Sequence, residues 1–356
     1  KHELNRESPR ICADKKREDR RSESPLRILF TVSTMTRSGP ERALLKLVHG
    51  LKERGHSPLV VTAKQGGEFR QAFEAEGVLV HDAQLTTPSY PRTNLPVRAW
   101  KVARRVRSYS PDVWQSFRST PAYWHEGLVA ALAGIPYGMR FAIEPTYARE
   151  RWRLRCRLTD RVVMLTPSMR DRILAHWPRT ALPTRVIPNC VDTGRYCPDT
   201  GTRIRVRERM GWKPSDVVCF YVANLRRVKR HCFLLDRFRE ALRKNSHLRL
   251  VLVGSEHPDQ DSGLVPARIK EFGLEDRISW LGQREDIAEL LKAADTVVHP
   301  SELEGLSNAL LECMASALPC IVTDAPWSRD IIEHERQGIL VPVDDAAAWE
   351  SAIVGL

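Results

Sequence analysis

The stretch ELEGLSNALLECMASALPCIVTD, residues 302–324, decides the fold of this chain. It follows an apolar run, residues 296–298, that can be buried on both faces of a sheet, and it ends in a second apolar run, residues 319–323. Between the two runs, apolar residues recur at helical spacing, namely Leu310, Met314 and Ala317. Because almost no linker separates these segments, we predict two parallel strands joined by a helix.

Two glutamates flank the predicted start of this helix. Glu304 lies in the loop before it, and Glu312 lies eight positions later, about one turn inside it. Backbone N–H groups at a helix start lack carbonyl partners, so we expect those of Leu306, Ser307 and Asn308 to bind an anion. The spacing suits a ligand with a central diphosphate and a hydroxyl-bearing group near each glutamate. The spacing fits an alternative without a ligand equally well. In that case Glu304 is an ordinary charged residue of a loop, and Glu312 is a solvent-exposed charge on a helix.

The stretch resembles the signature of the retaining family 4 glycosyltransferases of the GT-B fold. In that signature, two glutamates eight positions apart flank a phosphate-binding helix start. The resemblance implies that Glu312 binds the ribose hydroxyls of a nucleotide sugar. It also implies that Glu304 is the catalytic residue, in contact with the transferred sugar and its leaving group. The resemblance extends over residues 26–354 and is stronger in the second half of the chain.

A second turn in the C-terminal half also carries the resemblance. Lys229 matches the lysine of an RLxxxK turn whose basic residues hold the donor diphosphate. Asn224 stands at the arginine of that turn, and Arg226 or Arg227 could supply the missing charge because a guanidinium forks onto phosphate oxygens. A basic helix start without a ligand is the alternative.

The N-terminal half matches the family less closely. Residues 38–42, SGPER, resemble a GGxER turn near the donor phosphates, in which Gly39 allows close approach of the backbone to a ligand. The family commonly has a histidine at the end of a DVVHxH strand, where this chain has Gln115 and Phe117. We interpret the nearby His125 as an ordinary helix residue. The absence of the histidine at Gln115 and Phe117 bears on catalysis more than on binding of the donor.

The alternation of apolar runs and helical patterns predicts an α/β protein with doubly wound, mostly parallel sheets. The resemblance implies GT-B architecture, with two Rossmann-like domains facing each other across a cleft. We expect a disordered charged tail at residues 1–25, an acceptor-side domain at 26–195 and a nucleotide-sugar-binding domain at 196–356. Residues 193–215 are interpreted as the linker region. The chain is expected to stop inside a helix, and the resemblance implies a further C-terminal helix that crosses back onto the first domain.

Composition is that of a soluble globular protein, with 356 residues, 42% apolar and 28% charged. No apolar run approaches the ~20 residues that span a bilayer, and the charged N-terminus does not resemble a secretory signal. Because the chain begins at Lys1, we expect a fragment or a processed chain. Eight cysteines without CxxC spacing favour a reduced cytosolic protein without structural zinc. They are Cys12, Cys156, Cys190, Cys197, Cys219, Cys232, Cys313 and Cys320.

The net charge of +12 is concentrated in the first half, with +6 in residues 92–107 and +4 in residues 149–161. We predict an amphipathic helix over residues 95–109 with its basic side chains outward. Its expected inward positions are Leu95, Val102, Val106 and Tyr109. Such a surface suits an anionic membrane or an anionic substrate. Nucleic-acid binding is disfavoured because no recognition motif accompanies the charge.

A DxD triplet at residues 259–261 is the metal motif of the other glycosyltransferase fold, but its polar surroundings favour a solvated loop. We therefore expect no metal and no cofactor, because basic side chains and a helix start can neutralise a diphosphate.

Taken with the resemblance, which implies a retaining glycosyltransferase, these features predict a metal-independent hexosyltransferase. The expected donor is a nucleotide-diphosphate sugar, with UDP favoured over GDP, and the expected acceptor is a hydroxyl of a glycan or lipid-linked molecule in envelope polysaccharide or glycolipid synthesis. The expected location is the cytoplasm, either free or attached peripherally to the inner face of the cytoplasmic membrane. The alternative is a degenerate GT-B protein that binds nucleotide sugar or glycan without turnover.

Overall fold

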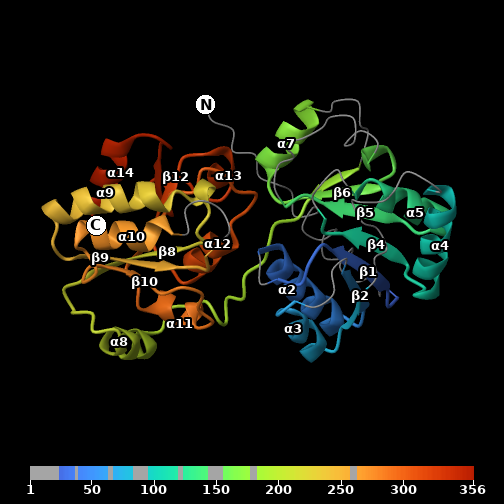
Figure 1. Ribbon diagram of the computed structural model, residues 1–356, viewed down its shortest axis with the longest axis horizontal. Helices are drawn as coiled ribbons and strands as arrows, with labels where there is room; N and C mark the ends of the chain where they lie inside the picture. The colour runs from blue at the N-terminus through green and yellow to red at the C-terminus, as the bar shows by residue number, and fades with distance from the viewer. Residues whose placement is uncertain are drawn as a thin grey trace, which may run out of the picture.

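A computed structural model describes residues 24–36, 39–62, 67–82, 95–118, 123–142, 155–176, 183–256 and 263–356. These residues form two α/β domains that lie side by side, the first drawn in blue to green and the second in yellow to red (Figure 1). In both domains all strand pairs are parallel, which confirms the predicted fold class of two Rossmann-like sheets. No described helix is both long and apolar enough to cross a bilayer.

The first domain is built on a seven-stranded sheet in the order β3-β2-β1-β4-β5-β6-β7. Its strands are β1 (Arg27–Val32), β2 (Ser57–Thr62), β3 (Leu79–Asp82), β4 (Val113–Ser116), β5 (Tyr137–Arg140), β6 (Arg161–Met164) and β7 (Thr184–Val186). Its helices are α2 (Gly39–Glu53), α3 (Arg70–Ala75), α4 (Leu95–Ser108), α5 (His125–Ala133) and α7 (Pro167–His176).

The second domain is built on a six-stranded sheet in the order β10-β9-β8-β11-β12-β13. Its strands are β8 (Val217–Val222), β9 (Leu248–Val253), β10 (Ile278–Trp280), β11 (Thr296–His299), β12 (Cys320–Thr323) and β13 (Gly338–Val341). Its helices are α8 (Thr200–Arg209), the 3₁₀ turn η2 (Arg227–Lys229), α9 (His231–Lys244), α10 (Leu264–Phe272), α11 (Ile287–Lys292), α12 (Asn308–Ala315), α13 (Pro326–Arg329) and α14 (Ala346–Val354).

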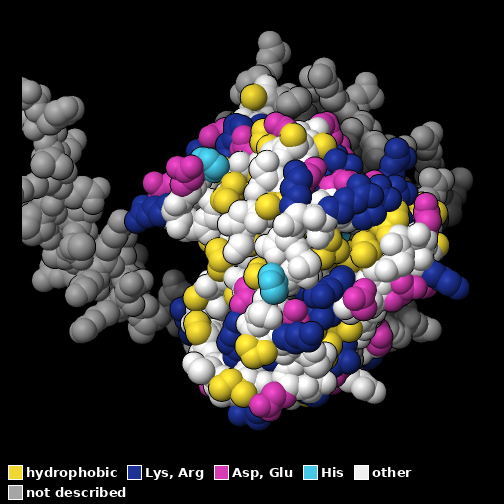
Figure 2. Space-filling model, turned by 90° about the vertical axis from the view of Figure 1, so that its left-hand side faces the viewer, with side chains coloured by type: hydrophobic (Ala, Val, Ile, Leu, Met, Phe, Trp, Pro, Cys, Tyr) yellow, Lys and Arg dark blue, Asp and Glu magenta, His cyan; other side chains and the backbone are white. Residues whose placement is uncertain are grey.

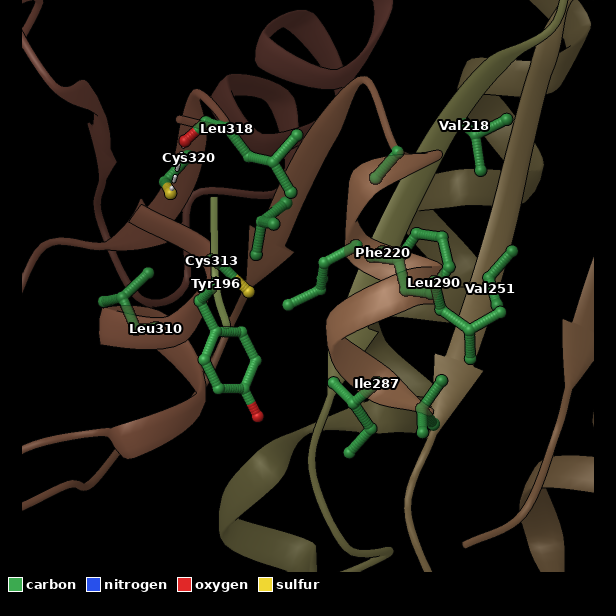
Figure 3. Packing of buried hydrophobic residues seen from close by; sticks show 14 of the residues in the cluster. Tyr196, Val218, Phe220, Val251, Ile287, Leu290, Leu310, Cys313, Leu318 and Cys320 are labelled. Carbon is green, nitrogen blue, oxygen red and sulfur yellow. Dashed lines mark hydrogen bonds between the residues drawn. The ribbon is translucent and has the colours of Figure 1, made fainter. Parts of the chain in front are cut away.

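Each sheet is covered by helices on both faces, as the two-sided burial of strands such as β8 and β12 requires. In β8, Phe220 faces α11 and α12, whereas the next residue, Tyr221, faces α9 and α14. Figure 3 shows Phe220 and Val251 of the sheet beside Leu290 of α11. The order of strands reverses between β1 and β4 in one sheet and between β8 and β11 in the other, and ligands of such sheets bind at the carboxyl ends there.

Three details differ from the sequence-based expectation. The segment interpreted as a linker contains α8, whose Val206 packs into the core of the second domain. Helix α12 ends at Ala315, and Ala317 is exposed with a left-handed φ of 57°, so it does not continue the apolar stripe. In α4, the fully buried positions are Ala99, Ala103 and Val106. Ala99 and Ala103 are not among the predicted inward positions, whereas the predicted Val102 and Tyr109 are partly buried and pack against the same core.

Candidate active site

A cavity of about 490 Å³ lies between the two domains at the carboxyl ends of their strands. The second domain contributes the ends of β8 and β9 and the start of α12, and the first contributes the start of α2 and the ends of β5 and β6. All of the site residues predicted from the sequence line this cavity: Gly39, Asn224, Arg226, Lys229, Glu304, Leu306, Ser307, Asn308 and Glu312. The fold therefore brings together residues separated by most of the chain.

The start of α12 forms one wall of the cavity. Ser307 is the N-cap, and its hydroxyl oxygen accepts a hydrogen bond from the Leu310 amide at 3.3 Å. The first-turn amides that remain for a ligand are those of Asn308 and Ala309, which have no carbonyl four residues earlier within the helix. Of the three expected donors, only Asn308 belongs to this turn, because Leu306 and Ser307 precede it.

Glu304 lies at one end of this wall, and its side chain is only 12% exposed. The Lys229 ammonium forms an ion pair with Oε1 of Glu304, and Nε2 of His299 lies 3.2 Å from the same oxygen. Burial raises the pKa of Glu304, but Lys229 and His299 outweigh it and bring the pKa to about 2. Burial also lowers the pKa of His299, so a neutral imidazole donates from Nε2 to an ionised carboxylate.

The turn after β8 supplies the positive side chains of the cavity. The Tyr221 hydroxyl donates to the Lys229 carbonyl at 2.7 Å and so anchors η2 beneath the cavity. Arg226 lines the cavity and is exposed, so this residue, of the two arginines considered, is placed to supply the charge absent at Asn224. The Asn224 side-chain oxygen accepts from the Ser255 amide at 3.3 Å. Asn224 therefore fixes the turn rather than adding charge.

Glu312 lies at the other end, on the side of α12 that faces the first domain. Its carboxylate is 6% exposed and lies 3.1 Å from Nζ of Lys46 in α2. Figure 3 shows the Tyr196 ring beside Leu310 and Cys313 of α12. Burial and the Glu312 carboxylate raise the pKa of Tyr196 to about 12, so its hydroxyl remains protonated beside that carboxylate. Glu312 is thus a buried, ion-paired group and not a solvated helix charge.

The loop between Glu304 and α12 also joins the two domains. A Cβ on Gly305 would lie 1.8 Å from the carbonyl oxygen of Ala142 after β5, so only glycine permits this approach. The Leu306 side chain packs into the core of the first domain, and the Leu306 carbonyl accepts from Nδ2 of Asn189 at 3.3 Å. Leu306 therefore contributes a domain contact, with its backbone at the cavity.

No histidine lies at the carboxyl end of β4 in the described chain. Gln115 is half-buried beside Gly138, and Phe117 is buried against Phe30. His125 begins α5, does not line the cavity and has a pKa of about 4 because burial lowers it. The interpretation of His125 as an ordinary helix residue agrees with this position.

Behind the end of β4, a charged cluster is fully buried. Glu126 lies 2.9 Å from Nη1 of Arg118 and 3.6 Å from Nη2 of Arg155, and it accepts hydrogen bonds from Ser116 and Tyr137 at 2.6 and 2.9 Å. Burial raises the pKa of Glu126, but the two arginines outweigh it and keep the carboxyl ionised. Arg155 was counted in the basic surface, and this prediction is wrong because its side chain is 0% exposed.

Within the described ranges, no group of three or more His, Cys, Asp or Glu side chains is arranged to hold a metal ion. The DxD triplet, residues 259–261, lies outside the described residues. No disulfide links the described cysteines.

Sequence patterns did not single out three residues that build the site. His299 ends β11, five positions before Glu304, so its place at a strand end was a usable signal. Lys46 and Tyr196 reach Glu312 from distant parts of the chain, and no local pattern marks them.

Comparison with known proteins identifies related chains for nearly the whole length. The family model described as Glycosyltransferase Family 4 matches residues 37–195, and the model described as Glycosyl transferases group 1 matches residues 216–356. A GDP-mannose-dependent alpha-mannosyltransferase of Mycobacterium tuberculosis is 27% identical over 329 residues, covering 86% of this chain and 81% of that protein.

Further relatives differ in the donor that they are named for. A UDP-Gal:alpha-D-GlcNAc-diphosphoundecaprenol alpha-1,3-galactosyltransferase of Escherichia coli is 25% identical over 238 residues, covering 64% of this chain and 62% of its own length. Among solved structures, Anabaena Alr3699/HepE in complex with UDP and glucose has a TM-score of 0.78 at 20% identity, covering 93% of this chain and 89% of that one. With these matches and its two parallel-sheet domains, the chain belongs to glycosyltransferase family 4 and has the GT-B fold.

Proposed function

We propose that the chain transfers a hexose from a nucleotide-diphosphate sugar to an acceptor hydroxyl with retention at the anomeric carbon. The observation that carries this proposal is the placement of Glu304 and Glu312 on either side of the start of α12 in one cavity, with Lys229 paired with Glu304. A diphosphate bound at the α12 start leaves the ribose at Glu312 and the sugar at Glu304. This order reproduces the order of groups in a nucleotide sugar.

The side chains suggest how the reaction proceeds. The amides of Asn308 and Ala309 and the charges of Lys229 and Arg226 stabilise the negative charge that grows on the departing diphosphate. Glu304 is ionised and accepts a hydrogen bond from a sugar hydroxyl. The bond from the anomeric carbon to the diphosphate oxygen breaks, and the acceptor oxygen bonds on the same face. The departing diphosphate takes the acceptor's proton, so no enzymic nucleophile and no metal ion are required.

We propose that the nucleotide of the donor is UDP. GDP is the alternative, and the assay described below includes both. The Escherichia coli relative is named for a UDP sugar and the Mycobacterium tuberculosis relative for a GDP sugar. Acceptors of the lipid-linked or glycan type are proposed because the former relative is named for a diphosphoundecaprenol acceptor.

A release assay with a panel of UDP- and GDP-hexoses, with and without glycan and polyprenyl-diphosphate acceptors, tests this function. We expect nucleotide release that depends on acceptor and a product of retained configuration by NMR. Glu304→Gln should lower the rate about 100-fold or more, because a fixed carboxylate at the reacting sugar is removed. Glu302→Gln, an exposed neighbour in the same loop, is the matched control. Absence of release from every donor contradicts the proposal.

A degenerate protein that binds the donor without turnover is the second candidate. The observation that favours it is the presence of Gln115 and Phe117, rather than a histidine, at the end of β4. Tight nucleotide binding in calorimetry without release from any donor and acceptor pair would support this candidate over the first.

We also propose an anionic membrane surface as a partner, contacted through α4. This helix exposes Trp100 (51%) and Val97 (54%) next to the basic residues Lys101, Arg104 and Arg105. Arg104 lies over the Trp100 ring at 5.0 Å, and Leu132 of the neighbouring α5 is also exposed. An indole flanked by basic residues suits the headgroup region of a bilayer. On the outward face of the second domain, by contrast, basic and acidic side chains are mixed (Figure 2).

A further inference from the structure

The donor cavity adjoins a second cavity, of about 860 Å³, between α2, α3 and the segment after β7. Arg42, Arg284, Ile287 and Glu312 line both cavities. Lys46 lines only the second, so it contacts Glu312 from outside the proposed donor cavity. A residue in this place can hold the carboxylate without touching the nucleotide.

The contact between Lys46 and Glu312 is sheltered from solvent. The ammonium is 25% exposed and the carboxylate 6%, and they lie 3.1 Å apart. Nζ of Lys46 also lies 3.5 Å from the Cys190 carbonyl oxygen and 5.9 Å from the centre of the Tyr196 ring. A buried carboxylate is costly without a charged partner, so the position of Lys46 determines where the Glu312 carboxylate can stay.

The same contact joins the two domains. Between described residues, it is the one ion pair that links the first sheet domain to the second. About two turns earlier on α2, the Gly39 carbonyl accepts a hydrogen bond from Nδ2 of Asn308 at 3.0 Å. These two contacts fix α2 alongside α12, which carries Glu312.

We propose that Lys46 is a positioning residue of the donor site that couples ribose binding to closure of the cleft. It holds Oε1 of Glu312, and the same carboxylate lines the donor cavity, where it accepts the ribose hydroxyls. Because the two residues belong to different domains, Glu312 has this orientation only when the domains are closed. Ribose binding and closure therefore favour each other to the same extent. This inference rests on the proposed role of Glu312 in ribose binding.

The test compares three variants and three ligands by titration calorimetry. The variants are K46M, which removes the cation, K46R, which keeps it, and K52M, which makes the same change on the exposed last turn of α2. The ligands are UDP or GDP, whichever binds more tightly, its 2′,3′-dideoxy analogue and inorganic diphosphate. Thermal unfolding of each variant checks the fold, and small-angle X-ray scattering with and without nucleotide measures closure.

We expect K46M to weaken binding of the ribonucleotide about tenfold, a typical size of coupling between two sites. Binding of the dideoxy analogue and of diphosphate should stay within about twofold, since neither presents ribose hydroxyls to Glu312. K46R should restore most of the affinity, and K52M should match the wild type. The compaction caused by nucleotide should be reduced in K46M.

Two results overturn the role of Lys46 while leaving the donor site in place. One is unchanged ribonucleotide affinity in K46M, and the other is an equal loss for all three ligands, which indicates general damage to the site. If the wild type binds neither UDP nor GDP, the proposed function fails and this inference fails with it. If it binds both the ribonucleotide and the dideoxy analogue equally, the ribose role of Glu312 is wrong, and so is the coupling.

Discussion

The side-chain amide of Asn308 donates a hydrogen bond to the main-chain carbonyl of Gly39 at 3.0 Å. These residues are the first of α12 and α2, so two helix starts from different domains meet at one point. Helix starts carry partial positive charge and amides without carbonyl partners. The junction therefore places the free amides at the start of α12 next to the first domain, in the wall of the cavity between the two sheets.

Glu312→Gln is expected to abolish tight nucleotide binding while the protein stays folded. Charge-assisted hydrogen bonds to two ribose hydroxyls contribute about 2–4 kcal/mol, so affinity should fall by a factor of ~30 to 1000. Titration calorimetry with UDP and GDP measures the loss, and circular dichroism checks the fold. Unchanged affinity in the variant would remove Glu312 from the ribose site.

Transfer is expected to need no divalent cation. Lys229, Arg226 and the amides at the start of α12 line the cavity and can neutralise a diphosphate. Activity should survive EDTA, and added magnesium or manganese should change the rate little. Complete loss in EDTA with recovery on addition of either metal contradicts this expectation.

The free energy of unfolding should fall as pH drops below about 6.5 because of His231. Burial lowers the pKa of this residue to about 3. Between these two values the unfolded chain binds a proton that the folded protein does not, so stability is present above pH 6.5 and is lost as pH falls. At pH 5 the loss from one such group is about 2 kcal/mol. Glu304, whose pKa is about 2, contributes a loss only below the ordinary carboxyl range.

Urea unfolding at pH 7.5 and pH 5.0 measures the effect of His231. His231→Gln should show a smaller difference between the two pH values than the wild type, and His247→Gln, at an exposed position, should not. Equal pH dependence in all three proteins would show that His231 is protonated to the same extent in the folded and unfolded states.

Gly305→Ala should separate the domains and weaken catalysis. The added Cβ would lie 1.8 Å from the Ala142 carbonyl oxygen, which is main chain and cannot move aside on its own. We expect a larger radius of gyration in scattering and a lower rate, with secondary structure unchanged. Gly263→Ala, where nothing lies within 4 Å of the new Cβ, is the control. A variant as compact and active as the wild type would show that the loop adapts.

The protein should bind anionic liposomes but not neutral ones, and binding should weaken as salt rises. Each basic residue near the surface contributes about 1 kcal/mol, so replacing Arg98, Lys101, Arg104 and Arg105 with glutamine should reduce attachment strongly. Trp100→Ala should reduce it further, whereas nucleotide affinity should not change in either variant. Equal binding to neutral liposomes, or none to either kind, rules out the membrane as partner.

Much of the fold could be predicted because buried parallel strands have apolar runs, unbroken in residues 217–222 and interrupted only by Arg249 in residues 248–253. Strand β5 escaped prediction because its sequence, YGMR, has no apolar run, although all four residues are buried between β4 and β6. Tertiary position, not local pattern, makes it a strand.

The residues of the candidate site also differ in whether a local sequence pattern could predict them. Glu304 and Glu312 lie in one short segment, so a linear signature marks them. Lys46 lies 266 positions from Glu312, and only the packing of α2 against α12 brings them together. The basic run that included Arg155 was misjudged for a similar reason, since sequence does not show that Glu126 lies opposite it in the core.

The contacts of residues 305–306 have a consequence for exchanging domains between relatives. The second domain does not end at its own surface, since its Leu306 packs into the core of the first domain. In a chimera that joins residues 196–356 to the first domain of a relative, that domain must therefore supply three things. They are a pocket for Leu306, a main-chain carbonyl placed like that of Ala142 against Gly305, and a cation for Glu312. Grafts chosen by these three features should retain activity more often than grafts chosen by overall identity.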